Sequence, residues 1–190
     1  MSLPPVIVVS GASGSGKTTL CRMASERLCL YYSISHTTRP KRANEKDGRD
    51  YHFITGQEFD KILAGNGFLE WAEVYGYRYG TSRQEIDFHL QKGKGVILDV
   101  DTQGALSIKK NRPSAFLVFI RAPSHEHLEE RLIQRGSETV EHRKHRLHQA
   151  SHEEAFMDQY DAVLVNAHLK ETYAQLQLLI EKRFPTNAQA

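Results

Sequence analysis

The chain has 190 residues, of which 39% are hydrophobic and 25% are charged, as is typical of one globular domain. Its 25 Lys and Arg nearly balance its 23 Asp and Glu, which excludes a strongly basic nucleic-acid-binding protein. The chain has only two cysteines, which excludes a disulfide framework and a zinc–cysteine cluster. No apolar run approaches the roughly 20 residues that a membrane span needs, which excludes a transmembrane segment.

Five short apolar segments predict strands buried on both faces, because they hold aliphatic and β-branched residues without strict polar alternation. These segments are 6–9, 30–34, 96–100, 116–120 and 163–165. Apolar residues at helical spacing predict helices over 18–28, 125–135 and 170–184. The alternation predicts an α/β fold with a doubly wound parallel sheet flanked by helices.

A glycine-rich segment follows the first strand and precedes the first helix. It consists of Gly11, Ala12, Ser13, Gly14, Ser15, Gly16, Lys17 and Thr18. This is the G-x-x-x-x-G-K-[ST] pattern in its strand–loop–helix context, where backbone N–H groups and the helix N-terminus converge on phosphates. Lys17 can reach the β- and γ-phosphates, and the Thr18 hydroxyl suits Mg²⁺. The segment therefore predicts binding of a nucleoside triphosphate.

Residues 36–90 interrupt the strand–helix alternation, because they are rich in Gly, Asn, Arg and aromatic residues and contain no long buried strand. We interpret them as a small inserted lobe of short strands, with helices over 57–64 and 82–91. Two arginines and two tyrosines of this lobe could form a charge-assisted cradle for one phosphate dianion. They are Arg39, Arg42, Tyr51 and Tyr79.

Two aspartates, Asp99 and Asp101, lie at the carboxyl end of the strand predicted over 96–100. Residues two apart on a strand point to the same side, so both carboxylates should face one way. In open α/β sheets the ligand crevice lies beyond the carboxyl ends of the strands. We therefore expect Asp99 to hold Mg²⁺ through water and Asp101 to reach a second substrate.

Residues 125–155 concentrate Arg and His in a helical pattern. Arg131 and Arg135 lie one helical turn apart on one face, and Arg146 lies on a following helix over 141–154. Four histidines have partly helical spacing, but no pattern of Cys, Asp or Glu accompanies them, so they do not predict a metal site. They are His142, His145, His148 and His152.

Together these motifs resemble the guanylate kinase family over nearly the whole chain. The motifs are the glycine-rich loop, S-I-S-H-T-T-R-x-x-R, D-Y-x-F, F-L-E-W, Y-G-T-S, L-D-V-D-T-Q-G, R-L-x-x-R-G and a late V-N pair. The resemblance implies a P-loop kinase with a five-stranded parallel sheet, transferring the γ-phosphoryl group of MgATP to GMP in guanine nucleotide synthesis and recycling. It also implies a core of 1–34, 91–124 and 156–190, a GMP-binding lobe over 35–90 and a helical lid over 125–155.

The resemblance assigns the guanine site to Ser35, Glu70, Thr81 and Asp101, and the GMP phosphate site to Arg39, Arg42, Tyr51 and Tyr79. Guanine presents N1–H and N2–H₂ donors beside the O6 acceptor. A Glu70 carboxylate can accept from both donors, and the hydroxyls of Ser35 and Thr81 can donate to O6. Adenine would place the N1 lone pair against this carboxylate and leave buried polar groups unmatched.

For the ATP side, the resemblance implies that Arg131, Arg135 and Arg146 act with Lys17 to neutralise the transferring phosphoryl group. It places Asn166, after the last predicted strand, near the adenine of ATP. The acceptor is already a phosphate oxygen, with a second pKa of about 6, so no general base is required. We expect in-line positioning and charge neutralisation to drive transfer, with both lobes closing when both substrates are bound.

Two alternatives remain. The first is a peptide-binding scaffold module of guanylate-kinase-like fold, against which the intact Lys17, Thr18 and arginines argue. The second is a ribose bisphosphate kinase of similar fold, against which the guanine-site residues argue. The N-terminal segment lacks the basic region of a signal peptide, so we expect a cytoplasmic protein. We expect ATP, GMP and dGMP as ligands, neither nucleic acid nor membrane as partners, and a monomer or weak homo-oligomer.

Overall fold

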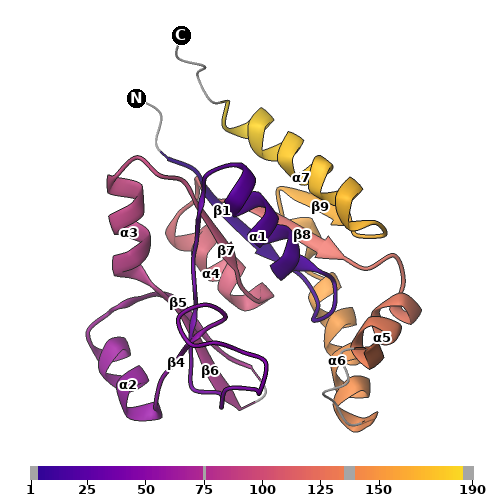
Figure 1. The fold of residues 1–190 in the computed structure, drawn as a ribbon, viewed down its shortest axis with the longest axis horizontal. Coiled ribbons are helices and arrows are strands. Elements are labelled where there is room, and N and C mark those ends of the chain that lie inside the picture. The colour runs from indigo at the N-terminus through magenta and orange to yellow at the C-terminus, as the bar shows by residue number, and fades with distance from the viewer. Residues whose placement is uncertain (1–3, 75, 135–139, 186–190) are drawn as a thin grey trace.

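The core of the molecule is a parallel sheet with the strand order β2-β7-β1-β8-β9. The computed structural model, shown in Figure 1, describes residues 4–74, 76–134 and 140–185. The strands are β1 (Val6–Ser10), β2 (Tyr31–Tyr32), β7 (Val96–Asp99), β8 (Phe116–Arg121) and β9 (Ala162–Val165). All neighbouring pairs in this sheet are parallel. The five predicted strands and the α/β class are therefore confirmed.

Helices cover both faces of this sheet, because alternate residues of each strand point to opposite sides. Ile7 and Val9 of β1 pack with α1 (Lys17–Arg27) and α7 (Leu169–Arg183). Val6 and Val8 face α3 (Arg83–Gln91) and α4 (Thr102–Asn111). Helix α4 has no counterpart among the helices predicted from the sequence.

A second sheet of four strands, in the order β4-β3-β6-β5, lies beside the carboxyl end of the core (Figure 1). Its strands are β3 (His36–Thr37), β4 (His52–Phe53), β5 (Phe68–Val74) and β6 (Tyr77–Ser82). Helix α2 (Gly56–Ala64) begins with a reciprocal cap between Thr55 and Glu58 and buries Phe59 against Phe68. The expectation that this segment holds no long buried strand is wrong, since β5 has seven residues and its first three are buried.

Helices α5 (His125–Gln134) and α6 (Val140–Glu154) flank the glycine-rich loop on the other side. Leu128 and Leu132 of α5 and Ala150 of α6 form a small apolar cluster with Ala12 of the loop. A short 3-10 helix, Met157–Gln159, leads back to β9. Within the described residues, no helix is both long and apolar enough to cross a membrane.

Candidate active site

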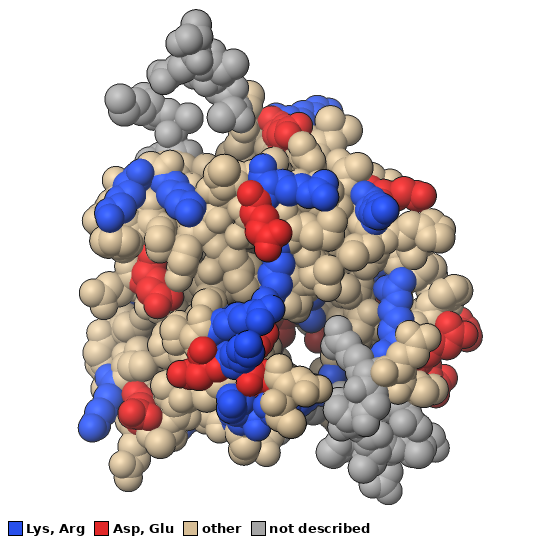
Figure 2. Space-filling model, viewed as in Figure 1, with Lys and Arg blue, Asp and Glu red and all other residues tan. Residues whose placement is uncertain are grey.

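One cleft brings together segments that are far apart in the sequence. Figure 2 shows the hollow in the lower half of this face, with charged side chains gathered beside it. Residues of the glycine-rich loop line it: Gly11, Ser13, Lys17 and Thr18. The end of β7 and the two residues after it contribute Asp99, Val100 and Asp101, and α6 contributes Arg146, Gln149 and Glu153. The four-stranded sheet and its loops contribute Ser35, Arg39, Arg42, Glu45, Tyr51, Glu70, Ala72, Val74 and Tyr79.

The glycine-rich loop is shaped for a close backbone approach. Gly11 has a φ of 142°, and a Cβ there would lie 2.0 Å from the Ile120 carbonyl oxygen. Gly16 has a φ of 92°, and a Cβ there would lie 2.3 Å from Asn166 Nδ2. Helix α1 begins at Lys17 without a side-chain cap, so its first N–H groups remain available to an anion at the loop.

Thr18 and Asp99 form a pair of oxygen donors beside Lys17. The Thr18 hydroxyl donates a hydrogen bond to Asp99 Oδ2, and β7 ends at Asp99 in register with Val9 of β1. Both side chains are half-buried at the cleft. A hydroxyl and a carboxylate are ligands that Mg²⁺ accepts, directly or through water, so the pair fits this ion.

Asp101 does not lie on a strand. It caps α4, where its Oδ1 accepts a hydrogen bond of 2.7 Å from the Gly104 amide. The prediction that Asp99 and Asp101 lie on one side of a strand is therefore wrong, although both carboxylates do line the cleft. Burial raises the pKa of Asp101.

Arg39 is held by a carboxylate that the sequence analysis missed. Its guanidinium makes two hydrogen bonds to Glu45, of 2.7 and 3.1 Å, and lies over the Tyr51 ring at 5.4 Å. Arg42 donates its backbone N–H to Glu45 at 2.8 Å. Burial raises the pKa of Glu45, but the contacts with Arg39 and Arg42 outweigh burial, so the pKa is lowered overall. Arg39, Arg42 and Glu45 follow one another at intervals of three residues, and this spacing could have predicted the cluster from the sequence.

Tyr51 and Tyr79 complete this corner of the cleft, with their rings edge to face at 5.8 Å. The four predicted phosphate-binding side chains therefore line one cleft, with Glu45 between the two arginines.

Glu70 is a buried carboxylate at the far end of the cleft, only 7% exposed. It lies opposite Thr81 across the β5–β6 pair, next to a register shift between Phe68 and Glu70. The Thr81 hydroxyl donates to Glu70 Oε1 at 2.5 Å, so in this structure it contacts the carboxylate rather than facing the cleft. Burial raises the pKa of Glu70 to about 7. Ser35, the remaining predicted guanine-site residue, also lines the cleft.

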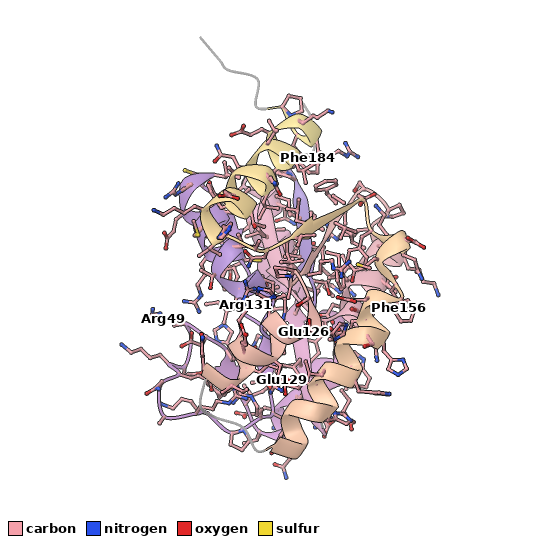
Figure 3. All side chains as sticks on the ribbon, turned by 90° about the vertical axis from the view of Figure 1, so that its right-hand side faces the viewer. Arg49, Glu126, Glu129, Arg131, Phe156 and Phe184 are labelled. Atoms are coloured by element: carbon pink, nitrogen blue, oxygen red, sulfur yellow. The ribbon has the colours of Figure 1, made fainter. Side chains whose placement is uncertain are left out.

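The predicted lid arginines are not all in one place. Arg146 donates to the Ser13 hydroxyl and lines the main cleft. Arg131, labelled on α5 in Figure 3, donates to the Asn166 carbonyl at 2.8 Å and lines a second hollow with Gly14 and Gly16. Arg135 lies outside the described residues.

Asn166 is buried behind the glycine-rich loop. Its Nδ2 donates to the Ser15 carbonyl at 2.7 Å, so the side chain fixes the loop from within and also lines the second hollow. This supporting contact of Asn166 was not predicted from the sequence.

Helix α6 adds two cleft residues that the sequence analysis missed, Gln149 and Glu153. Both follow Arg146 at helical spacing, by three and seven residues, which places them on the same face. Burial raises the pKa of Glu153. The described residues contain no group of three or more His, Cys, Asp or Glu side chains that could hold a metal ion.

Comparisons with known proteins show which family the chain resembles over most of its length. A family model described as guanylate kinase matches residues 4–183. The guanylate kinase of Thermotoga maritima is 43% identical over 167 residues, which cover 87% of this chain and 81% of that protein. The guanylate kinase of Gloeobacter violaceus is 43% identical over 184 residues, which cover 96% and 90%.

Two solved structures are also similar to this chain. A guanylate kinase from Anaplasma phagocytophilum superimposes with a TM-score of 0.80 at 28% identity, covering 98% of this chain and 89% of that one. A sugar kinase from Janibacter sp. HTCC2649 superimposes with a TM-score of 0.56 at 14% identity, covering 94% and 95%. The second likeness concerns the fold alone.

Proposed function

The chain belongs to the guanylate kinase family, and we propose that it transfers the γ-phosphoryl group of MgATP to GMP in the cleft described above, giving ADP and GDP. One observation carries the proposal. A triphosphate-type loop, an arginine–tyrosine cradle and a buried carboxylate open into the same cleft, so a phosphate donor and a purine monophosphate can be placed end to end.

On the donor side, the loop amides and Lys17 would hold the β- and γ-phosphates, with Thr18 and Asp99 holding Mg²⁺. Mg²⁺ held by this pair would supply positive charge that offsets the negative charge of the transferring phosphoryl group. Arg146 reaches the loop through Ser13 and would add charge at the transferring group. Arg131 and Asn166 line the second hollow, where we place the adenosine end of ATP. Arg135 is proposed as a further lid contact.

On the acceptor side, Arg39, Arg42, Tyr51 and Tyr79 would hold the GMP phosphate. Glu45 neutralises Arg39 in this structure, so the arriving phosphate would share or replace that pairing.

Glu70 would accept from guanine N1–H and N2–H₂, while Ser35 and Asp101 complete the guanine site. Thr81 would contribute by fixing Glu70 through its hydroxyl.

Phosphoryl transfer in this cleft needs no general base, because the GMP phosphate is largely ionised near neutral pH. Two anions must be brought together, so Lys17 and the arginines would lower their repulsion while the cleft excludes water. We propose that the lobe 35–90 and the lid 125–155 close on a core of 1–34, 91–124 and 156–190. We further propose dGMP as an alternative acceptor, a cytoplasmic location and a monomeric or weakly associating protein.

A panel of acceptors tests the proposal. With MgATP as donor, ADP formation is measured with GMP, dGMP, AMP, UMP and ribose bisphosphate. We expect turnover with GMP and dGMP, and loss of that turnover in Lys17→Ala. Turnover restricted to ribose bisphosphate would favour the ribose bisphosphate kinase alternative, and no ADP formation with any acceptor would favour the scaffold alternative.

A further inference from the structure

Gly104, in the first turn of α4, faces the carboxylate of Glu70. A Cβ at this position would lie 2.6 Å from Glu70 Oε2, 3.1 Å from its Cδ and 3.2 Å from Asp101 Oδ1. Leaving aside the backbone of α4 itself, the three atoms nearest to this Cβ position all belong to the carboxyl groups of Glu70 and Asp101. The absence of a side chain at residue 104 therefore makes room for the Glu70 carboxylate.

The backbone gives no reason of its own for this glycine. Gly104 is helical and is not among the glycines with a positive φ, so any L-residue could adopt its conformation. In a helix interior an alanine is usually more favourable than a glycine. The requirement for glycine comes from the space that Glu70 occupies.

The opposite side of the same carboxylate is also fixed. Thr81 on β6 donates to Glu70 Oε1 at 2.5 Å, while Glu70 Oε2 points at α4. The Glu70 carboxylate therefore lies between the Thr81 hydroxyl on β6 and the backbone of α4 at Gly104. Glu70 is 7% exposed and lines the cleft, so a ligand in the cleft can reach its carboxylate.

We propose that Gly104 is a positioning residue for guanine selectivity, which lets α4 approach Glu70 so that both carboxylate oxygens stand where the guanine N1–H and N2–H₂ groups arrive. This inference rests on the proposed function of Glu70 as the guanine acceptor. A methyl group at residue 104 would push the carboxylate into the cleft and misalign the paired hydrogen bonds. The donor side of the cleft would be untouched.

The test is the variant Gly104→Ala, compared with Gln103→Ala, an exposed neighbour in the same helical turn. We expect the KM for GMP to rise about 10-fold in Gly104→Ala, the order of one weakened hydrogen bond to a charged group, with KM for ATP unchanged. Inosine monophosphate lacks the 2-amino group, so its KM should rise less. Gln103→Ala should match the wild-type protein, and Gly104→Ala should remain folded at the assay temperature.

A second background separates positioning from packing. In Glu70→Asp the carboxyl group is one methylene shorter and leaves room for the added methyl, so Gly104→Ala should then cost less than it does in the wild-type protein. Equal costs in both backgrounds, or equal loss for ATP and GMP, would overturn the inference. If GMP turnover responds to Glu70→Gln but not to Gly104→Ala, only this inference fails. If the wild-type protein does not phosphorylate GMP, the proposed function itself fails.

Discussion

Replacing Glu70 by glutamine tests how the cleft distinguishes guanine. The substitution keeps the shape of the side chain but removes its charge and directs an amide NH₂ toward groups that need an acceptor. Glu70 is 7% exposed, so water cannot compensate for the mismatch. Losing a hydrogen bond to a buried charged group costs about 1.5–3 kcal/mol, or roughly 10- to 150-fold in affinity. We expect the KM for GMP to rise by that factor, with KM for ATP unchanged.

The pH dependence sharpens this expectation. The guanine donors bind the charged carboxylate, and the pKa of Glu70 lies at about 7 in the folded protein without GMP. The KM for GMP should therefore fall as pH rises from about 6 to about 8 in the wild-type protein. In Glu70→Gln the part of this dependence above pH 7, where the GMP phosphate is already ionised, should be lost. Initial rates of ADP formation at several pH values measure both effects.

Stability should change in the opposite sense to binding. The folded-state pKa of Glu70 is raised from 4.5 to about 7, so ionising the buried group lowers stability progressively as pH rises through that interval. The full shift corresponds to about 3 kcal/mol. Glu70→Gln should therefore unfold at a higher temperature than the wild-type protein at pH 8, with the difference shrinking toward pH 5.

Glu73→Gln, on the same strand but exposed, is the matched control and should change neither GMP kinetics nor stability. Unchanged GMP kinetics in Glu70→Gln, or equal losses for GMP and ATP, would refute the reasoning.

Three further substitutions or measurements follow from the geometry. Lys17→Ala should abolish phosphoryl transfer while calorimetry still detects GMP binding, because Lys17 serves the donor phosphates; near-normal turnover would contradict the loop assignment. Asn166→Ala should raise the KM for ATP and leave that for GMP unchanged, since Asn166 Nδ2 holds the Ser15 carbonyl at 2.7 Å; a selective effect on GMP would count against it. Small-angle scattering should show a smaller radius of gyration when GMP and a non-hydrolysable ATP analogue bind together, and an unchanged radius at saturation would exclude closure.

The strands of the core and the glycine-rich loop were predictable because each depends on a local pattern. Continuous apolar runs indicate strands buried on both faces. The glycine-rich loop pattern occurs between a strand and a helix, so it also predicts the elements on either side of it. Helix α4 was missed because it begins with the polar Thr102 and Gln103 and carries few apolar residues. Asp101 was accordingly assigned to a strand end, although it caps this helix.

The contacts within the cleft depend on tertiary structure and could not be predicted in the same way. The pairing of Glu70 with Thr81 requires the β5–β6 register, which shifts next to Glu70. The separation of Arg131 from Arg146 depends on how α5 and α6 pack against the loop, which sequence spacing within each helix does not specify. The role of Gly104 depends on the approach of α4 to β5.

Direct binding of GMP and AMP in the absence of ATP tests the central claim most closely. Calorimetric titrations of the wild-type protein at pH 7, in two buffers of different ionisation enthalpy, report affinity and proton exchange together. We expect GMP to bind with net release of protons from the protein, because guanine favours the ionised form of Glu70, and AMP to bind at least about 100-fold more weakly. Equal affinities for GMP and AMP, with no proton exchange that Glu70→Gln removes, would contradict this expectation.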